Sequence, residues 1–322
     1  MTTGVQATAT VPAHPALAPW CRLVEDGRRV LIEHAGTVVT LEGRAATLLL
    51  PRLLPLLDGT RTAAQIAEAL GPAAGPAVSK ALSMLAGERL LVEGPTALGD
   101  VDARTATATF AVGVTGRSTQ AAAVESLASA RVAVLGSSAT ARELRRLHGR
   151  SGIRVDALPI DAEPSDVALV VAAPEPTELE ELDRLNDHAR RCRQPWLQVL
   201  PYDGRFAVAG PLFLPDETAC RTCWVTRRAA CSGYEDDFQL VEALPVRAAA
   251  TAAVATLGAA LAVVLAVRWL ATGDPTLPGR FYALETRTIL RLRYERLLRV
   301  PRCPTCGPAR QAIPSPWFDV TG

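Results

Sequence analysis

Lysine is almost missing from this chain of 322 residues: Lys80 is the only one, beside 33 arginines. The formal net charge is +1, so no global attraction to nucleic acid or to an anionic membrane surface is expected. Residues 1–19 have neither a basic start nor an apolar core, and we expect no secretory signal peptide. The cysteine count of seven is odd, which favours a reducing, cytoplasmic location.

The longest uncharged stretch covers residues 248–267, between Arg247 and Arg268. About 20 apolar residues are enough to cross a bilayer. Half of this stretch is alanine, however, and two threonines and a glycine make it only weakly hydrophobic. We therefore predict a buried or interface helix that ends at Gly273, and no membrane partner.

Four of the seven cysteines form two CxxC pairs, Cys220-Arg-Thr-Cys223 and Cys303-Pro-Thr-Cys306. A CxxC turn lets two thiolates reach one metal ion, and two such turns complete a tetrahedral shell. The pairs are 79 residues apart, so one ion would join distant segments of the chain. We predict one structural zinc ion per chain, because four protein ligands leave no position for water or substrate. Two redox dithiols or a disulfide pair are the competing interpretations.

The region of residues 20–95 reads as a small winged-helix-like domain after a disordered tail at residues 1–19. Short strands are predicted at residues 22–24, 29–32 and 37–40, and a closing strand at residues 90–92. Helices are predicted at residues 48–57, from the capping box Thr62-Ala-Ala-Gln65 to Leu70, and at residues 76–86.

Such a domain could pack on the rest of the chain, bind DNA, or bind a peptide. The third helix carries only Lys80 in its body, which is poor for phosphate contacts and argues against nucleic acid. We favour a peptide added as a strand beside an apolar groove, with nearby arginines available for acidic peptide residues. The predicted peptide-binding residues are Arg28, Arg29, Thr37, Val38, Val39, Thr40, Val78, Ala81, Leu82 and Leu85.

A polar linker at residues 96–118 leads to an α/β domain at residues 119–322. Apolar strands at residues 131–136, 153–158, 167–172 and 195–200 alternate with helices at residues 140–149 and 177–193. This alternation predicts a parallel sheet with Rossmann-like topology.

The loop after the first of these strands reads Gly136-Ser-Ser-Ala-Thr-Ala141, where a nucleotide fold has G-x-G-x-x-G. Ser138 and Ala141 replace two glycines that let the backbone approach phosphate, and the domain holds no lysine. Asp156 does lie 20 positions after Gly136, where a ribose contact would be expected. We predict that ATP is not bound and that there are no catalytic residues.

Two parts of the chain together resemble one family. Leu56-Leu-Asp-Gly-Thr-Arg-Thr62, followed by Ile66 and Leu70, resembles a PqqD-like peptide-recognition element. The remaining signals resemble the adenylating fold of ubiquitin-activating and ThiF-like enzymes; in chain order they are the Gly136 loop, Pro195-Trp196, Gly210-Pro211, Asp216 to Cys223, the hairpin at residues 281–294, and Cys303 to Gly307. The chain is similar, over roughly Trp20 to Gly307, to the leader-peptide-binding partner proteins of YcaO cyclodehydratases, including the ocin-ThiF type of thiopeptide pathways.

The resemblance implies a protein without catalytic activity of its own. Its N-terminal element would bind the leader of a ribosomally made precursor peptide, and a separate YcaO cyclodehydratase would form the azoline rings. The chain ends soon after Cys306, so this partner is expected in trans, and a homodimer is allowed. The alternatives are an ATP-dependent adenylating enzyme that acts on a peptide or carrier C-terminus, and a DNA-binding regulator.

Overall fold

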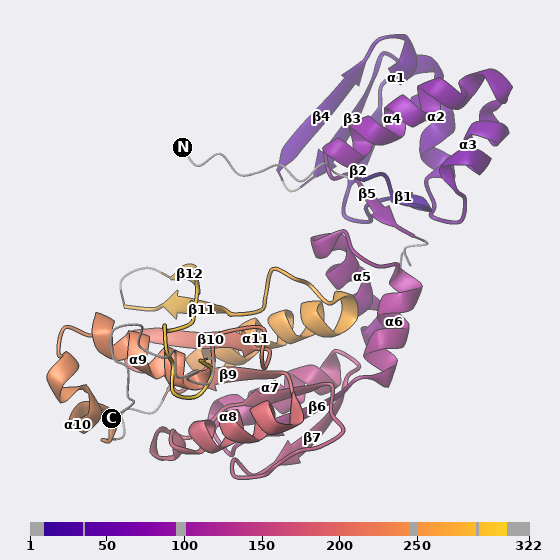
Figure 1. Cartoon of the computed structure of the whole chain (residues 1–322). Helices are drawn as coiled ribbons and strands as arrows, with labels where there is room; N and C mark the ends of the chain where they lie inside the picture. Colours follow the sequence, from indigo (N-terminus) through magenta and orange to yellow (C-terminus); the bar gives the residue numbers. More distant parts are fainter. Residues whose placement is uncertain (1–9, 35, 95–100, 245–249, 288–289, 308–322) are drawn as a thin grey trace, which may run out of the picture. The chain divides into compact units, whose positions relative to one another are not determined.

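The structure is a computed structural model that describes residues 10–34, 36–94, 101–244, 250–287 and 290–307. It divides into two compact units. The first comprises residues 1–130 with residues 150–153 and 267–274, and the second comprises residues 131–149, 154–266 and 275–322. Figure 1 follows the chain through both units.

The first unit contains a three-stranded antiparallel sheet in the order β2-β3-β4. Its strands are β2 (Arg22–Glu25), β3 (Arg29–His34) and β4 (Thr37–Glu42), in agreement with the predicted positions. Helices pack on one face of this sheet: α1 (Arg44–Leu48), α2 (Leu50–Leu53), η1 (Leu54–Leu56), α3 (Ala63–Leu70), η2 (Pro72–Ala74) and α4 (Gly75–Gly87).

The core of this unit forms where the inner face of β3 meets the helices. Val30 and Ile32 alternate toward the interior of the unit and are almost fully buried, together with Leu53 and Ile66. Thr62 begins α3 with the predicted capping box: the Gln65 N–H donates to Thr62 Oγ1, and Gln65 Oε1 accepts from the Thr62 N–H. The apolar face of β3 holds the helices against this sheet.

Two segments of the first unit differ from the prediction. Residues 1–19 were expected to be disordered. Residues 1–9 lie outside the described residues, but Pro15–Leu17 forms β1 and pairs with β5 (Leu91–Glu93). The strand predicted at residues 90–92 therefore belongs to a separate two-stranded sheet instead of closing a wing on β2–β4.

The predicted linker contains a helix, α5 (Ala103–Thr115), which precedes α6 (Gln120–Ser129). Asp102 caps α5 by accepting the Thr105 N–H, and left-handed Gly116 ends it. Alanine and threonine alone look like a polar linker, but Ala108, Ala111 and Val112 share one face and are buried there.

The second unit is built on a seven-stranded sheet in the order β12-β11-β10-β9-β8-β6-β7. Strands β7, β6, β8 and β9 are parallel, as predicted, and β10, β11 and β12 extend the sheet with antiparallel pairing. The strands are β6 (Arg131–Leu135), β7 (Arg154–Leu158), β8 (Leu169–Ala172), β9 (Trp196–Leu200), β10 (Phe206–Phe213), β11 (Arg280–Glu285) and β12 (Arg291–Arg296).

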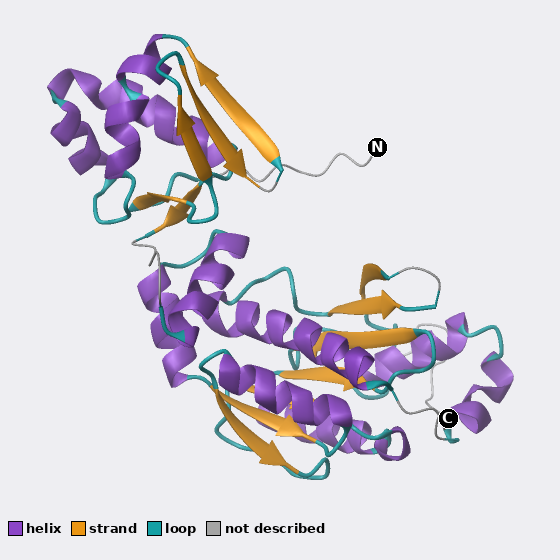
Figure 2. Ribbon diagram, turned by 180° about the vertical axis from the view of Figure 1, so that it is seen from behind, coloured by secondary structure: helices purple, strands orange, loops and turns teal. Residues whose placement is uncertain are grey.

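Helices cover both faces of this sheet, with α7 and α11 on one face and α8 and α9 on the other (Figures 1 and 2). Their bounds are α7 (Ala139–Arg150), η3 (Pro176–Glu178), α8 (Glu181–Cys192), α9 (Arg221–Cys231), η4 (Glu235–Asp237), α10 (Phe238–Glu242) and α11 (Ala252–Thr272). Sequence periodicity missed β10 and α9, which lie between the fourth predicted strand and the alanine-rich helix.

Helix α11 is the alanine-rich stretch. By length and composition it could cross a membrane, and 44 % of its most apolar 18-residue window is buried. Gly258 faces Ala207 of β10, where an added Cβ would lie 3.8 Å from the alanine Cβ. The small residues thus let this helix lie close to the sheet.

Candidate functional site

The four predicted metal ligands come together in the second unit. The sulfurs of Cys220, Cys223, Cys303 and Cys306 all lie within 4.8 Å of one another, and all four residues are buried. Three of the sulfur–sulfur distances are 4.0, 3.7 and 3.5 Å, for the pairs 220–223, 220–303 and 223–306. A tetrahedral zinc ion with bonds of about 2.3 Å would separate its sulfurs by about 3.8 Å. The cluster can therefore hold a metal ion, and its size suits zinc.

Two different local structures present these cysteines. Cys220 is the N-cap residue of α9, and Cys223 lies in the first turn of this helix. Cys303 and Cys306 lie in the turn that follows β12, where the Gly307 N–H donates to the Cys303 carbonyl. A side chain at Gly307 would meet that carbonyl oxygen at 2.4 Å, so the tight turn needs glycine here.

Hydrogen bonds favour the thiolate of Cys303, whereas burial raises the pKa of the Cys220 and Cys306 thiols. The Val300 N–H donates to Cys223 Sγ at 3.2 Å, and the hydroxyls of Thr222 and Thr305 bond to each other across the two turns at 2.7 Å. Burial opposes ionisation of Cys303, but the N–H groups of Cys306 and Thr305 lower its pKa to about 7. A buried shell with four ligands is closed, which is the form of a structural site.

In the loop after β6, which begins at Gly136, the side chain of Ser138 bonds to the backbone of the protein itself. Gly136 has a φ of +107°, and a Cβ there would meet the Ala173 carbonyl at 2.4 Å. Ser138 is buried, and its hydroxyl donates to the Ala173 carbonyl at 2.8 Å while accepting the Ala141 N–H at 3.0 Å. One N–H at the start of α7 is thus already satisfied by the side chain that replaces the second glycine.

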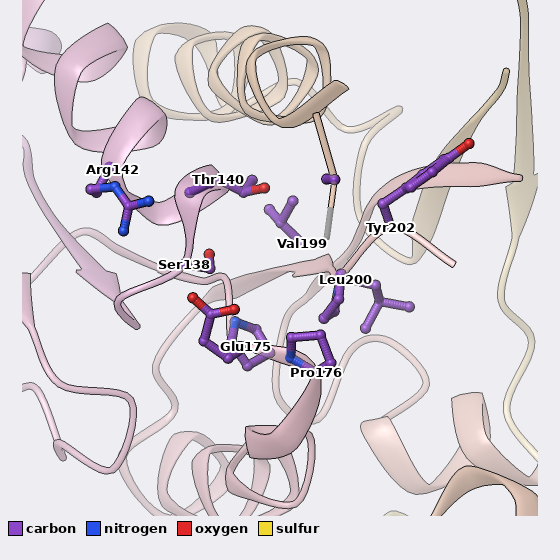
Figure 3. Close-up of a pocket in the computed structure, with 12 residues that line it drawn as sticks. Ser138, Thr140, Arg142, Glu175, Pro176, Val199, Leu200 and Tyr202 are labelled. Carbon is purple, nitrogen blue, oxygen red and sulfur yellow. The ribbon is translucent and has the colours of Figure 1, made fainter. Parts of the chain in front are cut away.

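A small cavity of about 220 Å³ lies beside this loop. In Figure 3, Ser138 lies between the side chains of Arg142 and Glu175, with Tyr202 on the far side. Arg142 Nη1 donates to the Ser137 carbonyl at 2.7 Å. The cavity is smaller than most sites for drug-sized ligands, which have about 300–1,000 Å³.

Positive charge at the loop comes from arginines that the sequence analysis did not single out. Besides Arg142, Arg145 donates through Nη1 to the Gly136 carbonyl at 2.9 Å. The two residues are three positions apart on α7, which places them on one side of the helix. The spacing was visible in the sequence, but its relation to the loop depends on the fold.

The predicted ribose contact has a different role. Asp156 lies within β7 opposite Ala133, and its carboxylate pairs with Arg131 Nε at 2.9 Å. Asp161, beyond the end of β7, instead lines a hollow of about 630 Å³ with Gly136 and Arg145. Counting 20 positions from Gly136 thus selected a residue within β7, which continues past Asp156 to Leu158.

We expect Ser138→Ala to lower the free energy of unfolding by about 1–3 kcal/mol, because the buried Ala173 carbonyl and the Ala141 N–H both lose a partner. Urea denaturation followed by circular dichroism measures this loss. Ser137→Ala is the matched control, since Ser137 is exposed. Equal stability of the two variants would contradict the capping role of Ser138.

The predicted peptide-binding strand lies at an edge of the first unit's sheet. Among the described residues, β4 pairs on one side with β3 and has no strand on the other. Thr37, Val38 and Thr40 are exposed, whereas Val39 is partly buried against the helices. Such an edge offers free backbone N–H and C=O groups to an added strand.

The two predicted arginines differ in whether their side chains are already paired. Arg29 is held by Asp26, with Nε 2.9 Å from Oδ2, and hydrogen bonds to this carboxylate lower the pKa of Asp26. Arg28 is exposed, and only its backbone N–H is bonded to Asp26. Arg28 is therefore the more available of the two for an acidic ligand.

The groove predicted along the third helix needs correction. Val78, Ala81, Leu82 and Leu85 are all buried in the core of the first unit, and Leu82 is only 1 % exposed. These residues form the apolar stripe of α4 because they hold the helix on the sheet, so they do not line an open groove. Among the large apolar side chains of α4, Met84 is the exposed one, at 41 %.

Comparisons with solved structures show which proteins share this fold. The chain is similar to the heterocyclase TruD, with 24 % identity and a TM-score of 0.64 over 92 % of this chain and 43 % of TruD. It is similar to E. coli MccB, in a structure with AMPCPP and MccA, with 15 % identity and a TM-score of 0.66 over 91 % of this chain and 99 % of MccB. MccB bound to N-formylated MccA, where it is described as a microcin C7 biosynthetic enzyme, gives a TM-score of 0.64.

The chain thus spans less than half the length of the heterocyclase that it resembles. No protein-family model matches the sequence, and a search of curated proteins finds no match. At these identities the likeness establishes the fold, a mixed α/β fold shared with MccB and with part of a heterocyclase. The winged-helix and PqqD-like character of the first unit stays a prediction.

One expectation is contradicted by these comparisons. The sequence analysis expected a protein that is not an enzyme, whereas the structures of the same fold are a heterocyclase and a biosynthetic enzyme. Reasoning from the altered glycine loop gave too much weight to one motif, because Arg142 and Arg145 supply charge there from outside it. The expected absence of ATP is also weakened, since MccB has been determined with ATP.

Proposed function

We propose that this chain is the precursor-binding part of a heterocyclase, an ATP-dependent enzyme that cyclises residues of a ribosomally made peptide. The observation that carries the proposal is its likeness to TruD, which extends over 92 % of this chain and over 43 % of TruD. A related structure is a heterocyclase with substrate and cofactor, matched over 91 % of this chain. The proposal assigns the ring-forming step of such an enzyme to a YcaO-type partner.

The first unit supplies the binding element in this proposal. The leader of the precursor peptide adds as a strand to β4, whose outer edge is free among the described residues. Arg28 can meet an acidic leader residue, although an exposed ion pair contributes only about 0.2–1 kcal/mol. Backbone hydrogen bonds to β4 therefore provide most of the affinity, and the cysteine cluster holds the second unit together.

A matched pair of proline variants tests the binding edge. Val38 of β4 and Val24 of β2 are 54 % and 53 % exposed, and they lie on opposite edges of the same sheet. We expect Val38→Pro to weaken binding of a fluorescein-labelled leader about tenfold or more in an anisotropy titration, since proline disrupts the edge that receives the peptide. Val24→Pro should keep the affinity.

The probe for this titration is the leader segment of a precursor peptide, synthesised with a fluorescein label. Melting curves of both variants show whether the sheet survives each proline. Equal loss of affinity in two folded variants would reject strand addition at β4, and loss in Val24→Pro alone would move the site to β2.

A second candidate function is ATP-dependent activation of a peptide carboxyl group. The likeness to MccB favours it, because that likeness covers 91 % of this chain and 99 % of MccB. Arg142 and Arg145 beside the Gly136 loop could neutralise part of a triphosphate. ATP–pyrophosphate exchange by the purified chain, with the precursor as the only other substrate, separates this function from the first.

A further inference from the structure

The seven-stranded sheet of the second unit ends in an open edge. Among the described residues, its last strand, β12, pairs with β11 on one side and with no strand on the other. All six residues of β12, from Arg291 to Arg296, are exposed. Figure 1 shows β12 beyond β10 and β11, at the margin of the sheet. The outer side of β12 therefore presents backbone N–H and C=O groups that an added strand can bond.

The two apolar side chains of β12 have large exposed surfaces. Leu292 is 53 % exposed and Tyr294 is 62 % exposed. They lie on the same side of the sheet, because side chains alternate along a strand. The Tyr294 ring contacts Tyr282 of β11, with ring centroids 6.1 Å apart. The surface that remains exposed is available to apolar side chains of a further strand on the outer side.

The other side of β12 carries Arg291 and Arg293, which share one carboxylate with Arg205. Nε and Nη2 of Arg205 both donate to Glu285 Oε1, at 2.8 and 2.6 Å. Arg293 Nη2 lies at the longer distance of 3.4 Å from Glu285 Oε2. Arg291 is the register partner of Glu285, yet it forms no ion pair in the described part of the chain. Three guanidinium groups thus surround a single carboxylate.

Two further arginines of the same hairpin lie opposite each other. Arg280 of β11 is the register partner of Arg296. The Arg280 guanidinium lies over the Tyr294 ring, 5.4 Å from its centroid. Within the described ranges, neither Arg280 nor Arg296 forms an ion pair. Like charges directly opposite each other destabilise a sheet, so an acidic residue beside them is favourable.

This distribution of charge discriminates between possible occupants of the edge. Residues 280–302 contain seven arginines and two glutamates. A second copy of this chain would bring two surfaces of the same positive excess together, and they would repel each other. A nucleic acid would neutralise the arginines but would leave the strand's backbone groups and Leu292 without partners. An acidic strand from another protein satisfies the charges, the backbone and the apolar side chains together.

We propose that the outer edge of β12 binds an extended segment of another protein in which acidic and apolar residues alternate. The segment adds to the sheet as a further strand. Its acidic residues lie beside Arg291 and Arg293 on one side of the sheet, and its apolar residues lie beside Leu292 and Tyr294 on the other. The inference does not rest on the proposed function, because β12 and β4 belong to different units and different sheets.

Fluorescence anisotropy with three labelled peptides and the full chain tests the chemistry of this segment. The probes are four Glu-Val repeats, four Lys-Val repeats, and a block peptide of four glutamates followed by four valines. We expect the Glu-Val peptide to bind and the other two to bind about tenfold or more weakly. The Lys-Val peptide is repelled by the arginines, and the block peptide does not separate its acidic and apolar residues onto two sides of a strand.

Charge reversal locates the binding site. The double variant Arg291→Glu/Arg293→Glu should lose the Glu-Val peptide and gain the Lys-Val peptide, a switch that a misfolded protein does not make. Arg154→Glu is the matched control, because Arg154 is an exposed residue of β7, the strand at the other end of the same sheet. Val38→Pro on β4 is the control for the leader site. Both controls should keep the affinity for the Glu-Val peptide.

The double variant Arg291→Gln/Arg293→Gln keeps the proposal testable if charge reversal prevents folding. It should bind the Glu-Val peptide about fivefold more weakly, as expected for the loss of two exposed ion pairs. Unchanged affinity in this variant, equal affinity of the wild type for the Glu-Val and Lys-Val peptides, or no binding at millimolar concentration would overturn the proposal. Tighter binding of octathymidylate than of the Glu-Val peptide would overturn it in favour of nucleic acid. A wild-type dimer that the glutamine variant disrupts would assign the edge to a second copy instead.

Discussion

Cys306→Ser will release the metal ion and unfold the second unit. The cluster joins the start of α9 to the turn after β12, and no other covalent or metal link connects these segments among the described residues. Structural zinc contributes on the order of 10 kcal/mol in small peptides, which is comparable to the whole stability of a typical domain. We expect about one zinc ion per chain in the wild type, by elemental analysis, and much less in the variant.

Cys192→Ser is the control for this experiment, because Cys192 is exposed and lies outside the cluster. It should keep both the zinc content and the melting temperature of the wild type. A chelator should act on the wild-type protein as Cys306→Ser does. An unchanged melting temperature after complete removal of the metal would contradict a structural role, and a dithiol titration would then test the redox interpretation.

Leaving this chain out of a heterocyclase reaction will slow ring formation by about 10²-fold or more when the precursor is dilute. A tethered leader raises the concentration of the core peptide at the partner's active site to about the millimolar range, compared with micromolar free peptide. The reaction contains the precursor, ATP and the YcaO-type partner, and mass spectrometry counts one lost water for each ring. Val38→Pro should reproduce most of the defect, and Val24→Pro should not.

The same reaction discriminates between the two candidate functions. Raising the precursor concentration should restore the rate without this chain if its contribution is tethering, because the effective concentration is then matched in solution. A precursor adenylated by this chain alone, without the partner, would support the MccB-like function. Full activity without this chain at low precursor concentration would contradict the heterocyclase proposal.

The sequence predicted correctly those features whose stabilising interactions lie within a few residues or follow from a continuous apolar run. The Thr62–Gln65 capping box forms with both of its hydrogen bonds, because all of its groups lie within one turn. The apolar run at residues 131–135 became β6, an interior strand between β8 and β7, since such a run is stable only when both faces are covered. The helix at Ala103–Thr115 was missed because its composition is that of a linker, and only burial of one face stabilises it.

The sequence by itself identified the four cysteines that form a cluster able to hold a metal ion, because the spacing of two CxxC turns is typical of such a site. Only the tertiary structure decided which of the predicted binding residues are accessible to a ligand. It buries Leu82 in a core although its stripe also suits a groove, and it pairs Asp156 with Arg131 of the neighbouring strand. It also buries Arg221 of α9 beside Gln198 of β9, 23 positions earlier in the chain. Burial and charge environment are set by contacts between distant segments, and a local pattern does not contain them.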